Sequence, residues 1–570
     1  MAHVAGLTRV PAKRSAWVDL CVFGLVAGLL GGLLAVGRRW AAPFVAVAPI
    51  DLSLTALPVY AGLSLARGVV AYVVSLAFTL AVGTLAGRSR RFERVILPAL
   101  DILQSIPVLS FLPGFSLALL ALFPGSNTGL ELACVLAIFT GQVWNMTFSY
   151  HASLRRIPAE LDEVARLHGV AGWRRFRLLE LPTATAGLVW NSMMSMAGGW
   201  FFLSVVEQFQ LGPGRAYRLP GLGSYMVEAI AAHDVRAMTG AVVAMVAVIV
   251  IVDRIVWRPL LCWSERFRSD DTAGAAPSRS FVYDMLRRSR VVAWIGRRSA
   301  ARPSSVTLSD LGPEPVAAGF RWSSLVLWAA AAAGLAALAW GAWRLAGMLA
   351  ELGAAAWLAV VLGLAKTSLR VVLCLAIGAL WTVPVGIALG RSERLSRWAL
   401  PLVQIVASFP APMVFPLIAV ALLRAGAGQN GTAIALMLLG SQWYLLFNAA
   451  AGAASVPNDL REAAVAFELT GMRRFVRLWL AGAAPALLTG LLTAAGGAWN
   501  ASIVCELVSY PGGRLRVDGV GSRIAEASAV GDEASLAAAT IAMMAAVVAL
   551  NRLVWQPLQH AAARRFAVNR

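Results

Sequence analysis

The sequence predicts an all-α, polytopic membrane protein that contains two tandem copies of a bundle of about six helices. Of its 570 residues, 59% are hydrophobic and only 14% are charged, with a mean hydropathy of +0.72, whereas a soluble protein carries about 25% charged residues. Apolar runs of about 20 residues recur, which is the length that crosses a hydrocarbon core as a helix. These runs are too long for membrane β-strands, in which apolar and polar side chains alternate over about 10 residues.

The first copy divides into six expected spans. They lie at residues 17–37, 63–87, 95–123, 130–150, 185–206 and 238–257. The third span contains Pro98, Pro107 and Pro113, so we expect it to be kinked or broken. Basic residues before the first span place the N-terminus in the cytoplasm. Since no small-residue cleavage site follows, we expect this span to be retained.

The character of the chain changes at residues 261–321, where the hydrophobic runs stop and arginines mix with Ser, Pro and acidic residues. We interpret this segment as a basic cytoplasmic linker between a first domain at 1–260 and a second at 322–570. Its piece FVYDMLRRSRVVAWIGRR is basic and amphipathic. It fits a helix on the inner membrane surface and equally a solvated linker.

The second half repeats the first. GRSRRFERVILP at 87–98 recurs as GRSERLSRWALP at 390–401, 303 residues later. Other matches lie 299 residues apart: Trp144 with Trp443, Trp200 with Trp499 and Glu207 with Glu506. Each copy has an even number of expected spans, so both copies enter and leave on the same side. This predicts a parallel, pseudo-two-fold repeat, with the C-terminus also in the cytoplasm.

Charge and motifs exclude several other classes. The net charge is +20, but the basic residues lie in short loops beside apolar runs, where they mark cytoplasmic ends. We therefore expect no nucleic-acid partner. The five cysteines form no CxxC pair or metal-spaced cluster, so we expect no metal site. There is no G-x4-G-K-[ST] phosphate loop and no clustered nucleophile, so we expect no catalytic residue and no cofactor bound by this chain.

The most informative repeated stretches are polar. Residues 157–182 read IPAELDEVARLHGVAGWRRFRLLELP, and residues 456–481 read VPNDLREAAVAFELTGMRRFVRLWLA. In each, a proline can start a helix, a glutamate suits its early turns, and a glycine permits the chain to reverse. Charge alone favours an ordinary basic loop between two spans. The duplication of Glu-x-Ala followed by Gly favours a functional element.

These residues resemble the EAA loop of ABC-transporter permeases, whose pattern is Glu-Ala-Ala, a later Gly and a Leu-Pro entry to the next helix. The second copy keeps the triplet at 462–464, and the first copy has Val164 in the middle of its triplet. Only the first keeps the entry, as Leu181-Pro182, and Glu468 stands where the first copy has Gly169.

In that family the loop forms a coupling helix that docks in a cleft of the ATP-binding subunit. The resemblance implies two tandem type I importer permease domains in the inner membrane. It also implies two ATPase subunits on the cytoplasmic face, which use ATP and Mg, and a periplasmic or lipid-anchored binding protein. The coupling residues that it implies are Glu163, Ala165, Gly172, Glu462, Ala463, Ala464 and Gly471.

Within these permeases, the nitrate, sulfonate, taurine and bicarbonate group is the most similar. The similarity is carried by Ile106-Pro107 to Pro113, by Gly221-x-Gly223 and by Ser368-Leu369-Arg370. It implies a small anion as substrate. A secondary transporter or channel with an internal duplication, embedded likewise in membrane lipid, is the alternative. It explains the repeat but gives no reason for matched Glu-x-Ala loops.

Four charged residues are candidates for the translocation pathway. Arg67 and Arg370 occupy equivalent positions at the outer end of the second span of each copy. They either draw anions toward the pathway or snorkel at the interface. Glu207 and Glu506 end the fifth spans and are expected to pair with these or other arginines, because a lone carboxylate in a membrane is expensive. A gate and a structural ion pair both remain open.

Overall fold

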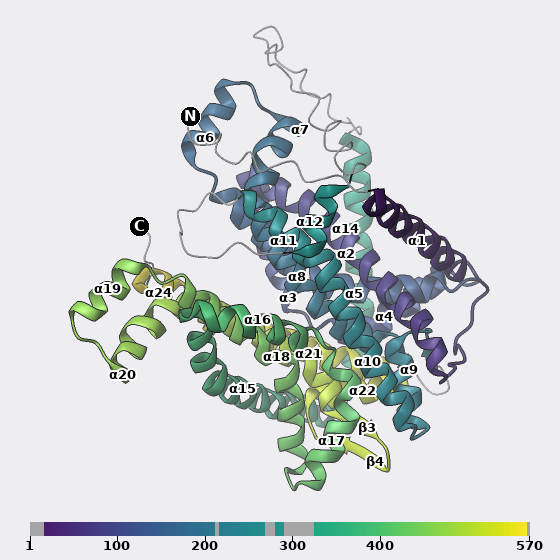
Figure 1. Cartoon of the computed structure of the whole chain (residues 1–570). Helices are drawn as coiled ribbons and strands as arrows, with labels where there is room; N and C mark the ends of the chain where they lie inside the picture. The colour runs from purple at the N-terminus through teal and green to yellow at the C-terminus, as the bar shows by residue number, and fades with distance from the viewer. Residues whose placement is uncertain (1–15, 211–215, 268–279, 290–323, 567–570) are drawn as a thin grey trace.

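We describe a computed structural model of the chain, which covers residues 16–210, 216–267, 280–289 and 324–566 (Figure 1). Long helices dominate these residues, and two short antiparallel hairpins complete them.

The first half begins with a long helix and ends in the region of the expected linker. Its elements are α1 (Ala16–Trp40), η1 (Leu54–Ala56), α2 (Leu57–Arg88), α3 (Arg90–Ser105), α4 (Val108–Leu122), α5 (Thr128–Arg155), α6 (Ala159–Leu167), α7 (Gly172–Arg175), η2 (Phe176–Glu180), α8 (Leu181–Val206), β1 (Gln208–Gln210), β2 (Ala216–Arg218), α9 (Leu222–Ala231), α10 (Val235–Val252), η3 (Asp253–Trp257), α11 (Arg258–Ser264), η4 (Glu265–Phe267) and α12 (Phe281–Arg288).

The second half follows the same order. Its elements are α14 (Ser324–Ala350), α15 (Ala354–Arg391), α16 (Glu393–Ser408), η6 (Ala411–Val414), α17 (Phe415–Arg424), α18 (Gly428–Ala454), α19 (Asn458–Ala466), α20 (Gly471–Arg474), η7 (Phe475–Leu480), α21 (Ala481–Cys505), β3 (Leu507–Tyr510), β4 (Gly513–Arg516), α22 (Val520–Val530), α23 (Glu533–Leu550), η8 (Asn551–Trp555) and α24 (Gln556–Phe566). The π-helical turns η2 and η3 recur as η7 and η8, so the repeat extends to irregular turns within the helices.

The expected break in the third span is present in both halves. The chain bends by 98° between α3 and α4 and by 70° between α16 and α17. Pro107 and Pro410 stand at these bends. A proline disfavours helical geometry in the residue before it, and Ile106 and Phe409 are accordingly extended, with ψ of 123° and 129°.

The two broken spans join the halves. Helices α3 and α4 pack against α21, α22 and α23 of the second half, while α16 and η6 pack against α8, α9 and α10 of the first. One hydrophobic core runs through both halves, with Leu109 and Met193 from the first and Met413 and Trp499 from the second. The halves therefore form one packed body with an approximate two-fold relation.

By length and composition, seven helices among the described residues can cross a membrane, or up to nine if each bent pair is one span. Together with the repeated order of elements, this confirms the prediction of an all-α polytopic protein with an internal duplication.

The expected linker lies mostly outside the described residues, at 268–279 and 290–321. Its expected first residue, 261, lies inside α11. Of the basic amphipathic piece, residues 281–288 form α12, which contacts α1 and α11. The Ser289 hydroxyl donates to Asp19 of α1 at 2.6 Å. The described residues 281–289 of the segment are therefore packed on the first half.

Candidate functional site

The candidate residues fall at two opposite ends of the helical bundle. At one end, which we call the loop end, the first loop (residues 157–182, with α6, α7 and η2) and the second loop (residues 456–481, with α19, α20 and η7) project from it. Figure 1 shows the first loop at the top and the second loop at the left, both away from β3 and β4. The other end, which we call the hairpin end, carries β1–β2, β3–β4, α9 and α22.

The predicted coupling residues have the same arrangement in both loops. In each, the helix follows a proline, with Glu163 and Glu462 exposed and Ala165 and Ala464 buried. An alanine at this position lets the loop helix pack closely against the bundle. Ala463 is partly buried. Gly172 and Gly471 have positive φ angles of 55° and 50°, which glycine adopts at little cost.

Ion pairs anchor the first loop. The buried Glu180 carboxylate accepts hydrogen bonds from Arg88, the last residue of α2, at 2.9 and 2.8 Å, and from Arg175 at 3.0 Å. Arg175 is also 2.7 Å from Asp162 of α6, and Arg88 donates to the Gly172 carbonyl at 2.8 Å. Charged groups therefore connect α6 to α2.

The second loop is anchored by apolar packing. Trp479 occupies the position of Glu180 and packs with Ile387, Val456 and Ala464. The guanidinium of Arg461 lies 5.3 Å from the centre of the Trp479 ring. The two copies thus hold equivalent loops by different interactions, ion pairs in the first and apolar packing in the second.

Glu468 takes the conformation of the glycine that it replaces. Its φ is 52°, close to the 62° of Gly169 in the first loop. A left-handed conformation costs a residue with a side chain about 1–2 kcal/mol. The substitution noted in the sequence therefore introduces local strain without changing the shape of the turn.

Both loops expose large apolar side chains. The most exposed are Leu167, at 78%, and Phe467, at 79%. The others are Leu161, Val164, Trp173 and Leu178 in the first loop and Leu460, Val465, Met472 and Val476 in the second. Clustered apolar side chains on projecting elements mark interaction surfaces.

A cavity of about 190 Å³ lies between the two halves. Aromatic side chains from both halves line it, among them Trp144, Phe201, Phe409, Trp443, Tyr444 and Trp555. Its polar lining consists of amides and hydroxyls, among them Gln104, Thr140, Asn145, Thr493, Asn500 and Asn551. Among the described residues that line it, none is Asp, Glu, Lys or Arg. A charged solute inside would therefore meet dipoles and aromatic faces.

The four charged pathway candidates lie near the hairpin end, where they are buried. Arg67 of α2 makes a two-pronged ion pair with Glu131 of α5, at 2.6 and 2.8 Å, and donates to Glu207 at 2.8 Å. Glu207 also accepts from the Ser64 hydroxyl at 2.5 Å and from the Gly223 N–H at 2.7 Å. All charges in this network are paired, as burial requires.

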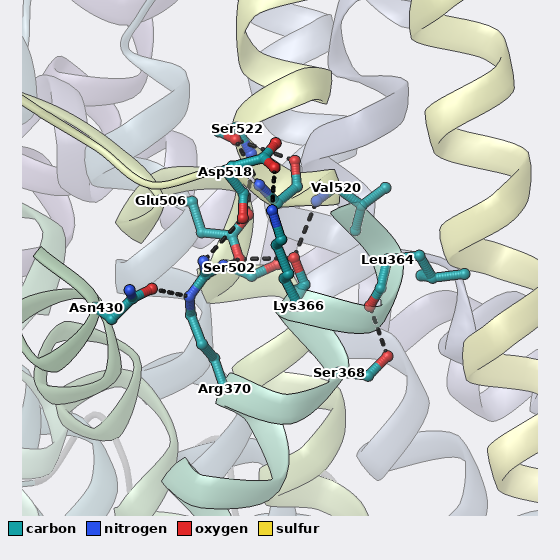
Figure 2. A network of polar contacts seen from close by, with 12 residues as sticks. Leu364, Lys366, Ser368, Arg370, Asn430, Ser502, Glu506, Asp518, Val520 and Ser522 are labelled. Atoms are coloured by element: carbon teal, nitrogen blue, oxygen red, sulfur yellow. Dashed lines mark hydrogen bonds and ion pairs between the residues drawn. The ribbon is translucent and has the colours of Figure 1, made fainter. Parts of the chain in front are cut away.

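The second half contains a related network, shown in Figure 2. Arg370 donates to Glu506 at 2.7 Å and to the Asn430 amide oxygen at 2.9 Å. Glu506 also accepts from the Thr367 hydroxyl at 2.7 Å and from the Ser522 N–H at 3.1 Å. Asn430 thus stands where the first half has the carboxylate of Glu131.

The repeated Gly-x-Gly provides room for the buried carboxylates. A Cβ at Gly221 would lie 2.1 Å from Glu207, and one at Gly519 would lie 2.2 Å from Glu506. Any side chain there would displace the carboxylate. The motif is therefore a packing requirement of these two networks.

The structure brings Arg67 to Glu207 and Arg370 to Glu506, as the cost of lone intramembrane carboxylates led us to expect. Arg67 is 1% exposed and Arg370 is 6% exposed, so neither reaches toward solvent as a snorkelling side chain would. None of the four lines the cavity between the halves, although Arg370 lines a separate pocket at the hairpin end. Their role in a pathway stays a prediction.

Sequence reasoning missed several polar residues. Glu131 and Glu180 were not singled out, although each is a charge in or beside an apolar run. Asp101 of α3 accepts hydrogen bonds from Asn551 and Gln556 of the other half, at 2.8–3.1 Å. The repeat gave one usable signal for the cavity, since its residues Trp144 and Trp443 are matched in the two copies.

Comparison with known proteins identifies the family. A family model described as "Binding-protein-dependent transport system inner membrane component" matches residues 79–256 and again residues 382–562. The chain belongs to this family. The two matches lie within the two expected domains, and they confirm the resemblance to ABC-transporter permeases. The chain is therefore a multi-pass permease component of the inner membrane.

Three curated relatives illustrate the similarity. The putative aliphatic sulfonates transport permease SsuC of Bacillus subtilis is 26% identical over 157 residues, 28% of this chain and 54% of that protein. The nitrate import permease NrtB of Synechococcus elongatus is 26% identical over 129 residues, 23% and 45% respectively. The bicarbonate permease CmpB of the same organism is 29% identical over 140 residues, 24% and 49%. The chain thus spans about half the length of the curated relatives that it matches.

Proposed function

We propose that this chain supplies both permease domains of an ATP-driven importer that moves a small anion of the nitrate, sulfonate or bicarbonate type across the inner membrane. The names of SsuC, NrtB and CmpB support this substrate class. The loop end and both termini face the cytoplasm, and the hairpin end faces a periplasmic or lipid-anchored binding protein.

The observation that carries the proposal is the matched pair of projecting loops. Each loop combines an exposed glutamate with exposed apolar side chains at the same end of the bundle. Two such surfaces fit two ATPase subunits, one for each loop. ATP and Mg are bound and used by those subunits. Closure of the ATPase pair then moves the loops, and through Arg88 it moves α2.

The cavity between the halves is the proposed place of passage. Indole N–H groups, amides and hydroxyls donate hydrogen bonds to an anion without supplying a full positive charge. A transport site must bind strongly enough to admit its substrate and weakly enough to release it. A lining without fixed charges suits that requirement. The buried networks around Arg67 and Arg370 hold the helices at the hairpin end together.

The test is the double variant Glu163→Arg with Glu462→Arg, reconstituted with the ATPase subunit that co-purifies with the chain. We expect both substrate uptake and stimulation of ATP hydrolysis to fall by at least about tenfold, since two charges are reversed in a desolvated contact. The control is Glu351→Arg, an exposed glutamate in the connection between α14 and α15.

Unchanged uptake and ATPase stimulation in the double variant would show that the loops do not couple. Uptake that proceeds without any ATPase and follows an ion gradient would instead establish a secondary transporter.

A further inference from the structure

A second pocket lies at the hairpin end, and only the second half contributes to it. It is formed by α15, the start of α18 and β4. Its polar lining consists of Lys366, Arg370, Arg516, Asp518 and the amides of Gln429 and Asn430. Leu369, Leu373 and Ile434 form its apolar side. The pocket is separate from the cavity between the halves, with which it shares no lining residue.

The position of the pocket along α15 matches the boundary of a membrane's hydrocarbon core. Arg391 ends α15 at the loop end. At a rise of 1.5 Å per residue, Arg370 lies about 32 Å and Lys366 about 37 Å from it along the helix. A hydrocarbon core is about 30 Å thick. The two cations therefore lie at its boundary. Leu369, 61% exposed, and Leu373, 41% exposed, lie at the same depth or deeper and face away from the bundle.

The two halves differ in charge at this place. In the first half, two arginines at 67 and 218 stand with three carboxylates at 131, 207 and 228. In the second half, four cations at 366, 370, 516 and 523 stand with three carboxylates at 506, 518 and 526. Asn430 in place of Glu131 and Lys366 in place of Leu63 account for much of this difference. Among these ion-paired groups, those of the second half therefore carry one surplus positive charge, and those of the first half carry one surplus negative charge.

Figure 2 shows how two of these cations, Lys366 and Arg370, lie. The ammonium of Lys366 contacts Asp518 at 2.6 Å, and Asp518 is also 2.9 Å from Arg523. Asp518 therefore keeps one partner if Lys366 turns to a ligand. Arg370 is held by Asn430, Glu506 and the Asp518 carbonyl. The exposed cations are Lys366 and Arg516, with side chains 52% and 55% exposed, and Arg516 pairs with Glu526 at the surface. Such exposed pairs are weak, so both cations are able to turn to phosphate oxygens.

We propose that this pocket binds an anionic phospholipid, with the headgroup phosphate between Lys366 and Arg516 and an acyl chain along Leu369 and Leu373. The exposed leucines beside the cations favour a lipid over a free anion, because a free anion gains nothing from an apolar wall. The pocket lies in the leaflet at the hairpin end. The proposal goes beyond the transport function and does not depend on it.

The test uses the full chain in detergent micelles doped with phosphatidylglycerol or phosphatidylcholine, and retained lipids are counted by native mass spectrometry. The variants are Lys366→Leu and Asn430→Glu, each of which installs the residue of the first half. Each changes the local charge by one unit, so we expect phosphatidylglycerol retention to fall by about fivefold. Retention of phosphatidylcholine should not change. The control Arg236→Leu removes an exposed cation at the same end but outside the pocket.

A charge-conserving variant guards against loss of folding. Lys366→Arg keeps the positive charge at an exposed side chain, and it should retain as much phosphatidylglycerol as the parent chain. Unchanged phosphatidylglycerol retention in both Lys366→Leu and Asn430→Glu would overturn the proposal. It would also be overturned if millimolar glycerol 3-phosphate displaced the lipid completely, because the site would then recognise a free anion.

Discussion

Replacing Glu180 with Gln should loosen the first loop and leave the second unchanged. The Glu180 carboxylate is 2% exposed and receives three charge-assisted hydrogen bonds from Arg88 and Arg175. Such bonds contribute about 1.5–3 kcal/mol each. The arginine side chains are 36% and 25% exposed, which reduces that contribution through solvent screening. Because Gln keeps the shape and one acceptor oxygen, we expect a loss of about 2 kcal/mol.

The assay is hydrogen–deuterium exchange on the full chain in lipid nanodiscs, which reports local opening. A loss of about 2 kcal/mol raises the opening constant of residues 159–180 about 30-fold. Residues 458–480 should exchange at the parent rate, because Trp479 anchors them by apolar packing.

Raising NaCl from 0.1 to 1 M shortens the Debye length from about 10 to 3 Å. This should accelerate exchange in the first loop of the parent chain more than in the second. Equal changes in both loops, in the variant or with salt, would refute the reasoning.

Three further predictions concern stability. Gly221→Ala should lower stability by about 3 kcal/mol, because its Cβ would lie 2.1 Å from Glu207 and displace a paired buried charge. Thermal unfolding in detergent measures this, and Gly62→Ala, which has open space, should be neutral or stabilising. Glu468→Gly should raise stability by about 1 kcal/mol through release of the left-handed strain; a drop would show that Glu468 makes a compensating contact. Asp532 caps α23, and hydrogen bonds from the side chain of Ser535 and from its backbone N–H lower the pKa of the Asp532 carboxyl. Asp532→Ala should therefore cost about 1 kcal/mol at pH 7, and this difference should disappear as the pH falls through the lowered pKa, below about 3.9. A difference that persists at pH 2 would contradict the charged cap.

The duplicated fold was predictable because its signals are local and repeated. The several prolines of each third span predicted a kink or break there. Which proline makes it was not predictable, since Pro107 stands at a bend while Pro98 and Pro113 lie inside α3 and α4. The pairing of Glu207 and Glu506 with arginines was predictable, because a lone carboxylate inside a membrane is costly.

Other features depend on distances between spans, which a sequence does not contain. The partnership of Glu131 with Arg67 requires α2 and α5 to be adjacent. The exchange of Glu180 for Trp479 is visible when the copies are aligned. Its consequence, an ionic anchor in one loop and an apolar anchor in the other, appears only once α6 and α19 are packed on the bundle. The cavity lining depends on the broken spans crossing between the halves.

Site-specific photocross-linking tests the central claim most directly. A photoreactive amino acid at Leu167 or at Phe467 places the probe on an exposed apolar side chain of each loop. The same probe at Glu351 lies in the connection between α14 and α15, away from both loops. In the complex that co-purifies with the chain, both loop positions should form an adduct with the mass of an ATPase subunit, and Glu351 should form none. An adduct at Glu351, or none at either loop, would contradict the assignment of the two loops as the ATPase contacts.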